Sequence, residues 1–471
     1  MSKHPSPPVT ATRARAILLA PAAVAVAWLG GTLLLWLATS RRPEDLTGSV
    51  LLVALSGVGA LMAGYWLSLR GSGVGDVSAS VPERLPRALS PSLAAGIAVA
   101  GGLYYAGRAW GIVAPVATAG WDISDPVCSL TRAYVARQEA LMAAGDPGGL
   151  QSLLNLFGVL QYVTIPLLVL LWGSLPRWAR TLGTVGVAAY CFAWLLVGSV
   201  KGLAETALVV LAAMLVWVAR VALGTSKGTR LSGRAVALAA GAAVLGGALL
   251  AVTLLGSRVV DPKSCFLPDA PGQGQGTGQG PGQGGGTISI VGAPQGTGAR
   301  VLLDYVTHGY SGLSSSLSLP FVWTKGVGAS PGLDRLNPFV SLPSDPALGP
   351  YPVRAEKATG WPAYGRWQTM YPWLASDLTF PGAVLLVGLV GFGFGLSWAR
   401  AVRGRSAVLA TSWFSFLMLL VVYLPLNNQP IAATSAVIGL MSLVLVTVWT
   451  RLARRTPVPA AADTPDEGTT V

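Results

Sequence analysis

Cationic and aromatic side chains alternate through residues 321–378, and this combination suits chemistry on a phosphorylated sugar. Arg and Lys bind phosphate oxygens through charged hydrogen bonds, and Trp and Tyr faces stack on the apolar C–H surfaces of sugars. The members of this set are Trp323, Tyr351, Trp361, Tyr364, Trp367, Tyr371 and Trp373, with Lys325, Arg335, Arg354, Lys357 and Arg366. The segment predicts a phosphorylated-glycan site. The alternative is an aromatic belt at the headgroup level of a membrane, with Arg bound to lipid phosphate.

Three charged residues lie within or beside apolar stretches, where ionisable groups are costly and usually functional. Arg108 lies inside one stretch, and Lys201 and Glu205 open another. Lys201 and Arg108 are predicted to hold an anionic headgroup. The carboxylates that could accept a proton there are Glu205, Asp377, Asp304 and Asp122. The alternative is that Lys201 and Glu205, one helical turn apart, neutralise each other.

His308 belongs to a predicted amphipathic helix over residues 299–318. Arg300, Asp304 and His308 follow at four-residue spacing and form its polar face. The opposite face, expected to lie on the membrane, is formed by Leu302, Val306, Tyr310, Leu313 and Leu317. The polar face either lines a substrate site, with His308 as an acid or base, or is an ordinary solvated face.

These side chains must be positioned by a membrane-embedded scaffold. Of 471 residues, 52% are hydrophobic and 11% are charged, whereas a soluble domain carries about 25% charged residues. A span needs about 20 apolar residues in helical form. The stretches that qualify are 16–39, 49–69, 92–113, 151–173, 182–200, 203–222, 235–256, 379–399, 406–426 and 430–450. We therefore expect an all-α polytopic membrane protein with about ten transmembrane helices.

The charge distribution predicts the orientation. The net charge of +13 comes from 32 Lys and Arg against 19 Asp and Glu, and the excess cations lie in loops that fall on one side of ten spans. The positive-inside rule makes that side cytoplasmic, together with both termini. The basic balance is thus a topology signal, and no nucleic-acid partner is expected.

The long hydrophilic segment between the seventh and eighth spans is then extracytoplasmic. The expected organisation is a membrane domain with transmembrane helices 1–7 over 1–256, an extracytoplasmic loop over 257–378, transmembrane helices 8–10 over 379–450 and a cytoplasmic tail over 451–471. Within the loop, residues 268–298 are rich in Gly, Gln and Pro and predict a flexible tether. Cys128 and Cys265 both fall outside, where a disulfide persists, although their spacing leaves the pairing open. Two His and three Cys predict no metal site.

Two local patterns resemble the O-antigen and oligosaccharide repeat unit polymerases. The run from Gly198 through Ser199, Val200 and Lys201 to Gly202 is similar to the Gly-Ser-Arg-Gly signature that opens a span in that family. The run from Asp377 through Leu378, Thr379, Phe380 and Pro381 to Gly382 is similar to the Asp-Φ-Gly-x-x-Gly entry into the span after the large loop. Lys201 replaces the usual Arg, and Thr379 replaces the first Gly. The related ligases carry a His-Asn pair where this chain has Trp367-Gln368, which favours the polymerases.

The resemblance implies a reaction on a polyprenyl-diphosphate-linked oligosaccharide at the outer face of the cytoplasmic membrane. Cations would stabilise the departing diphosphate, without metal or cofactor, while a carboxylate or His assists an acceptor hydroxyl. The expected catalytic set is Arg354, Arg366, Lys201, Glu205, Asp377 and His308. The expected substrate-binding set is Arg108, Arg335, Lys325, Trp361, Trp367 and Trp373. The partners implied are the lipid-linked oligosaccharide and membrane lipids, with a chain-length regulator or flippase as candidate protein partners.

Three other interpretations remain open. One is a polytopic polyprenyl-phosphate-sugar glycosyltransferase, which would use Glu44 or Asp45 of the first outer loop. Another is a glycolipid transporter or flippase without catalysis, for which paired midplane charges and internal repeats are typical. The last is an unspecialised envelope protein.

Overall fold

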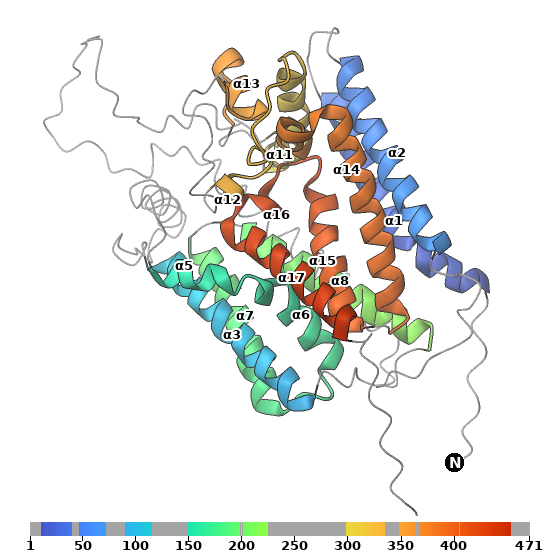
Figure 1. Cartoon of the computed structure of the whole chain (residues 1–471), viewed down its shortest axis with the longest axis vertical. Helices are drawn as coiled ribbons and strands as arrows, with labels where there is room; N and C mark the ends of the chain where they lie inside the picture. Colours follow the sequence, from blue (N-terminus) through green and yellow to red (C-terminus); the bar gives the residue numbers. More distant parts are fainter. Residues whose placement is uncertain are drawn as a thin grey trace, which may run out of the picture.

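All the regular secondary structure in the residues that the structure describes is helical (Figure 1). The computed structural model describes residues 11–39, 47–71, 90–114, 149–197, 199, 201–224, 298–334, 348–363, 368–404 and 406–453. These residues contain no strand. The helices are α1 (Ala11–Thr39), α2 (Thr47–Gly71), α3 (Pro91–Val113), α5 (Gly149–Leu156), α6 (Val159–Leu171), α7 (Arg177–Leu196), α8 (Lys201–Ala222), α11 (Gly298–Leu317), α12 (Pro331–Asp334), α13 (Tyr351–Thr359), α14 (Met370–Val402), α15 (Ala407–Tyr423), α16 (Gln429–Ala432) and α17 (Thr434–Ala453).

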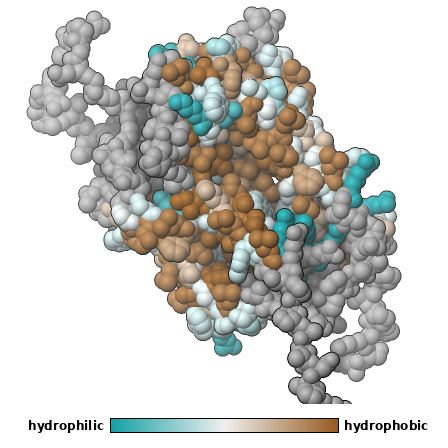
Figure 2. Space-filling model, in the orientation of Figure 1, coloured by the Kyte–Doolittle hydropathy of each residue, from teal (hydrophilic) through white to brown (hydrophobic). Residues whose placement is uncertain are grey.

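Six described helices are long and apolar enough to cross a membrane. They are α1, α2, α7, α8, α14 and α17. The surface agrees with this assignment, because apolar side chains dominate the face seen in Figure 2 and most hydrophilic patches lie near its edges. The prediction of a helical, membrane-embedded protein is confirmed at this level. Helices α3 and α15 cover two more of the expected spans but fall outside this set of six, and the expected span over 235–256 lies outside the described residues.

The expected single span over 151–173 is two helices. Helices α5 and α6 meet at a bend of 59°, where Phe157 and Gly158 donate to the carbonyls of Leu154 and Asn155 in tight turns. Gly158 lies directly against the backbone of α17 at Ser435, where a larger residue would not fit. Close backbone approach through small residues is the usual way in which helices pack in membranes. The bend therefore coincides with close packing of Gly158 on α17, which is distant in the sequence.

The spanning helices pack as two groups, joined through α6, α8 and α15. In the first group α14 packs along α2, with Gly64 of α2 against the backbone of α14 at Gly388. In the second group α3 packs along α7, with Gly186 of α7 against Gly102 of α3. Helices α11 and α13 lie at one end of the first group, beside the first residues of α14 (Figure 1). This end carries most of the predicted site residues that the structure describes.

Helix α11 packs inside the protein and does not lie along a membrane surface. Its residues Tyr310 and Leu313, from the predicted apolar stripe, are buried. The hydroxyls of Tyr310 and Thr32 of α1 lie 3.1 Å apart, and Nε1 of Trp36 donates to Oγ of Ser311 over 3.3 Å. This part of the predicted membrane-lying face is therefore covered by the protein itself, because α1 supplies both apolar and hydrogen-bonding partners for it.

Helix α14 contains a kink at the position where the resembled pattern has glycine. Thr379 has φ 64° and ψ 167°, a backbone region that is essentially restricted to glycine. The turns before the kink pack against α11 and α13, and the turns after it form the apolar span. The conformation resembles that of a glycine although the side chain is threonine, so α14 stores strain at this point.

Candidate functional site

Arg354 of α13 is the best candidate for binding an anion. Its side chain is only 7% exposed, and its guanidinium donates from Nη1 to the carbonyl oxygen of Pro320 over 2.8 Å and also interacts with the Tyr351 side chain. No described group lies at hydrogen-bonding geometry from Nε or Nη2. A buried cation with unsatisfied donors is costly. An anionic ligand with two oxygens would satisfy these donors, because guanidinium binds such groups with paired hydrogen bonds.

Tyr351 holds the guanidinium of Arg354 from one side. The guanidinium carbon lies 4.5 Å from the centre of the Tyr351 ring, a cation–π contact. Burial raises the pKa of Tyr351, and the charge of Arg354 opposes that rise. Burial also lowers the pKa of Arg354, and Tyr351 opposes that change. Because arginine starts from so high a value, Arg354 stays charged and Tyr351 stays neutral at physiological pH.

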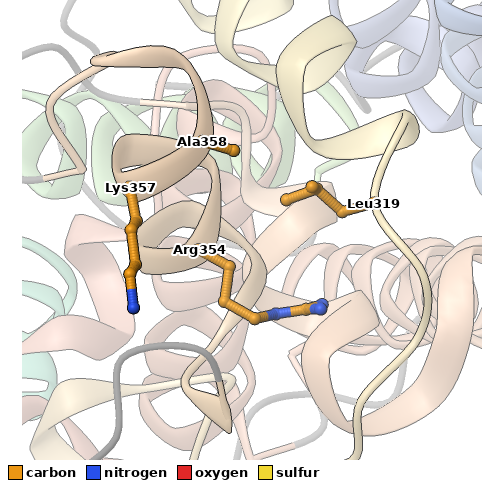
Figure 3. Close-up of a pocket in the computed structure, with 4 residues that line it drawn as sticks. All are labelled: Leu319, Arg354, Lys357 and Ala358. Carbon is orange, nitrogen blue, oxygen red and sulfur yellow. The ribbon is translucent and has the colours of Figure 1, made fainter.

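Arg354 lines an open pocket of about 210 Å³, together with Leu319, Lys357 and Ala358. Arg354 and Lys357 leave α13 in different directions, and Leu319 faces the helix from the segment that follows α11 (Figure 3). Lys357 is exposed, so the pocket has one buried cation and one mobile cation at its rim. Two cations and an apolar wall suit an anionic group attached to an apolar or amphipathic chain.

The start of α13 is anchored to α14. The backbone N–H of Tyr351 donates to Oγ of Ser376 over 2.9 Å, and that hydroxyl donates to the carbonyl of Pro372 over 2.8 Å. At the other end, Gly360 adopts φ 71° and donates to the carbonyl of Glu356 over 2.8 Å, which closes the helix. The position of Arg354 is thus set by α14 and by the local caps of a nine-residue helix.

Asp377 of α14 holds the loop that follows α11. Its Oδ1 accepts hydrogen bonds from the Thr324 hydroxyl over 2.6 Å and from the Gly326 backbone over 2.8 Å. Its Oδ2 accepts one from the Ala329 backbone over 2.9 Å. A carboxylate with both oxygens occupied in this way positions a loop, so the geometry gives Asp377 a structural role, while its expected catalytic role stays a prediction. The loop in turn carries Pro320, the partner of Arg354.

Other members of the predicted aromatic and cationic set are dispersed. Trp373 is 1% exposed, so its ring is packed inside the protein and is not placed to stack on a sugar. Trp361 is half-buried and its Nε1 lies against Gly312 of α11. Lys325 is exposed in the loop held by Asp377 and has φ 56°. Arg335, Arg366 and Trp367 lie outside the described residues.

A second group of polar side chains gathers around Arg108 within the membrane helices. Nη1 of Arg108 donates to Oε1 of Gln151 over 3.1 Å and to Oδ1 of Asn155 over 3.0 Å. Nη2 lies 3.5 Å from Oγ of Ser435. Gln151 and Asn155 are one turn apart on α5, so the bend before α6 directs both amides toward α3. Sequence reasoning missed these partners, although an i, i+4 pair of amides in an apolar stretch was a signal for them.

Lys201 and Glu205 lie beside this second group. Glu205 of α8 is half-buried and within electrostatic reach of both Lys201 and Arg108. The structure therefore brings these three predicted residues together. Gly198 and Val200 of the resembled pattern lie outside the described residues. Lys201 begins α8, as expected for a residue that opens a span.

His308 lies on α11. It is 9% exposed, and its ring meets the edge of the Tyr305 ring with centroids 5.7 Å apart. Tyr423 of α15 is within electrostatic reach of both Tyr305 and Glu205.

The described residues form two cationic regions. Among the described residues, no group of three or more His, Cys, Asp or Glu side chains is placed to hold a metal. Side chains of Asp304, Asp122, Glu44 and Asp45, and both Cys128 and Cys265, fall outside the described set. The chain matches no protein-family model, no curated protein and no solved structure.

Proposed function

We propose that this chain is a membrane glycan polymerase that transfers an oligosaccharide from a polyprenyl diphosphate carrier to an acceptor glycan. In this proposal it has about ten spans in the cytoplasmic membrane, with both termini in the cytoplasm. Residues 257–378 form the extracytoplasmic loop between helices seven and eight. The glycan is assembled on the outer face, where a chain-length regulator or flippase is a candidate partner.

The observation that carries the proposal is the unsatisfied guanidinium of Arg354 at the wall of an open pocket. A diphosphate leaving group develops negative charge as its bond to the sugar breaks, and preorganised donors stabilise that charge. Arg354 is held by Tyr351 and Pro320 without an ion pair to a described carboxylate. It therefore has donors available for the diphosphate, with Lys357 next to it and Arg366 as a second expected cation.

The transfer forms one bond and breaks one bond. The acceptor hydroxyl oxygen bonds to the anomeric carbon of the donor sugar, and the bond from that carbon to the diphosphate oxygen breaks. The electron pair of the broken bond stays on the diphosphate, and the hydroxyl proton moves to a base. Glu205 and His308 are the described candidates for that base, since both oxygens of Asp377 are already occupied.

Purified protein in proteoliposomes, supplied with a fluorescent polyprenyl-diphosphate-linked oligosaccharide, tests the proposal. Wild type should produce a ladder of longer glycans, and Arg354→Ala should abolish it. Arg354→Lys should retain part of the activity, because the charge stays and the paired donors are lost. Arg451→Ala, at an exposed cation on α17, is the matched control and should elongate normally. A wild-type protein that elongates no donor would contradict the proposal, and an active Arg354→Ala protein would remove this site from it.

One observation favours a second function, a glycolipid transporter or flippase. The bent pair α5–α6 places polar side chains beside Arg108 within the membrane helices, and broken helices next to charged groups are typical of transporters. The same proteoliposomes distinguish the two functions. Movement of the intact lipid-linked oligosaccharide across the bilayer without elongation would favour the transporter.

A further inference from the structure

The length of α14 gives the level of the membrane. The helix has 33 residues and carries Arg400 in its last turn, so at 1.5 Å per residue it is about 50 Å long. A hydrocarbon core of about 30 Å takes up about 20 residues, and counting back from Arg400 over that length reaches Phe380. The edge of the core then coincides with the kink at Thr379. The turns of α14 before the kink lie outside the core.

The exposed side chains of α14 agree with this level. Leu385, Leu389 and Phe392 are exposed at helical spacing and form one apolar stripe. Leu378, on the other side of the kink at Thr379, is also exposed. The stripe is the part of α14 that we assign to the lipid, and Leu378 lies just before it.

The loop after α11 is fastened at the level of Leu378. The backbone N–H of Thr324 donates to the carbonyl of Ser376 over 3.2 Å, and its hydroxyl donates to Asp377. These bonds hold the neighbouring side chains in place, and three of them are exposed: Phe321 at 43%, Trp323 at 62%, and Lys325. The loop thus exposes two large aromatic side chains and one cation near the end of the span. Such a set is best satisfied by a partner that has an apolar layer next to a polar one.

We propose that Phe321, Trp323 and Lys325 form an interfacial anchor that lies in the phospholipid headgroup layer. Tryptophan rings are enriched at this level because the indole is amphipathic, and lysine reaches lipid phosphate from there. The three side chains flank Thr324, which is bonded to Ser376 and Asp377 at the start of the span, and the positive charge complements the phosphate layer. A soluble protein or a free glycan would leave the position of this exposed aromatic pair at the end of the span unexplained.

The anchor has a consequence for Arg354. Pro320, which accepts the hydrogen bond of Arg354, is next in sequence to Phe321. The pocket is thus held beside the headgroup layer, where a membrane-borne phosphate arrives without leaving the bilayer. This consequence rests on the proposed function, whereas the anchor itself does not.

Depth-dependent quenching tests the anchor on the full-length protein. Cys128, Cys191 and Cys265 are replaced by Ser, and single cysteines are introduced as Trp323→Cys, Phe321→Cys, Thr359→Cys and Leu389→Cys. Each is labelled with an environment-sensitive fluorophore in vesicles of phosphatidylethanolamine and phosphatidylglycerol. The vesicles contain lipids with a nitroxide either near the headgroup or near the end of the acyl chain. Thr359 is exposed on α13, and Leu389 is exposed in the span, so they are the water and core references.

The anchor predicts that the labels at 323 and 321 lose more emission to the shallow nitroxide than to the deep one. The label at 389 should show the reverse order, and the label at 359 should keep its emission. Labels at 323 and 321 that behave like the one at 359, or like the one at 389, would overturn the anchor. The use of two positions guards against a single variant that fails to fold. If the labels at 323 and 321 are quenched mainly by the shallow nitroxide but the protein elongates no glycan, the anchor is supported and the proposed function is contradicted.

Discussion

Two arginines of this protein, the half-buried Arg108 and the buried Arg354, have opposite surroundings. Arg108 is surrounded by neutral acceptors from α5 and α17, which take up its Nη1 and Nη2 donors. Arg354 has one backbone acceptor and an aromatic ring, and its Nε and Nη2 donors have no described partner. Both lie in a protein that is rich in apolar residues, so both cations are costly to bury. Only one of them has its donors largely satisfied by the protein itself.

The difference separates a structural cation from a ligand-binding one. Side chains that complete the hydrogen bonds of an arginine stabilise the fold, and removing that arginine leaves buried acceptors unpaired. An arginine with open donors stabilises the fold less, but it is ready for an anion. The following changes test this contrast, beginning with the largest expected effect.

Arg354→Ala should lower the rate of glycan elongation by about 10²- to 10³-fold, the usual loss when one donor to a developing negative charge is removed. Its effect on the unfolding midpoint in detergent should be small, because within the protein Arg354 interacts only with the carbonyl of Pro320 and the side chain of Tyr351 among the contacts described. Elongation assays and thermal unfolding of the same preparation measure both quantities. A protein that is strongly destabilised yet still active would reverse the roles assigned to the two arginines.

Asp377→Ala should destabilise the region of Arg354 by about 3 kcal/mol, since it removes three hydrogen bonds to a charged group. Asp377→Asn should cost less, because one amide oxygen still accepts. Denaturant unfolding gives the free energies, and limited proteolysis within 319–330 reports whether the loop is released. If elongation is lost in Asp377→Asn while the loop stays protected, the carboxylate has a chemical role that its hydrogen bonds do not explain.

Arg108→Ala should destabilise the second group of helices by about 2 kcal/mol, because Gln151 and Asn155 lose their buried donor. Arg108→Met keeps much of the side-chain volume but removes the donors. It should lower the stability nearly as much, which would show that the hydrogen bonds and not the packing are responsible. Unfolding midpoints in detergent provide the measurement. Equal stability of wild type and both variants, with loss of elongation, would make Arg108 a substrate ligand, as the sequence alone predicted.

Thr379→Gly should stabilise the protein by about 1 kcal/mol. The strain of a non-glycine residue in this conformation costs about 1–3 kcal/mol. Glycine relieves this strain, but its larger conformational entropy in the unfolded state lowers the free energy of unfolding by part of that amount. Thr379→Ala is the matched control, because it removes the side-chain contacts and keeps the strained backbone. Stabilisation by alanine as well as by glycine would show that the backbone at Thr379 is not strained.

Composition and hydropathy were sufficient to predict the class of fold. Apolar stretches of span length identify membrane helices, because a helix that crosses the lipid must be both long enough and apolar. The six spanning helices follow that pattern. Hydropathy could not predict the bend between α5 and α6, since its cause is the contact of Gly158 with α17, which is distant in the sequence. The number of spans and the orientation remain predictions.

The sequence was sufficient to predict which residue types the candidate site contains. It was less informative about the role of each residue. Arg354 was selected as a cation in an aromatic segment, and Arg108, Lys201 and Glu205 were selected together. The role of Asp377 depends on three donors from the loop after α11, and the burial of Trp373 depends on neighbours from other helices. Residue spacing along one segment contains no information about such partners. A Thr in a glycine position, by contrast, was visible in the sequence and marks the kink.

One helix carries both the lipid-crossing turns and the support for Arg354. Because α13 and the loop after α11 are bonded to Ser376 and Asp377 on the same backbone, the pocket keeps a fixed height above the span. A bilayer that is thicker or thinner than this span would have to tilt the helix or deform around it. The distance from the pocket to the lipid phosphates would therefore change with acyl-chain length, and the kink at Thr379 is the point of α14 at which the pocket and the span meet.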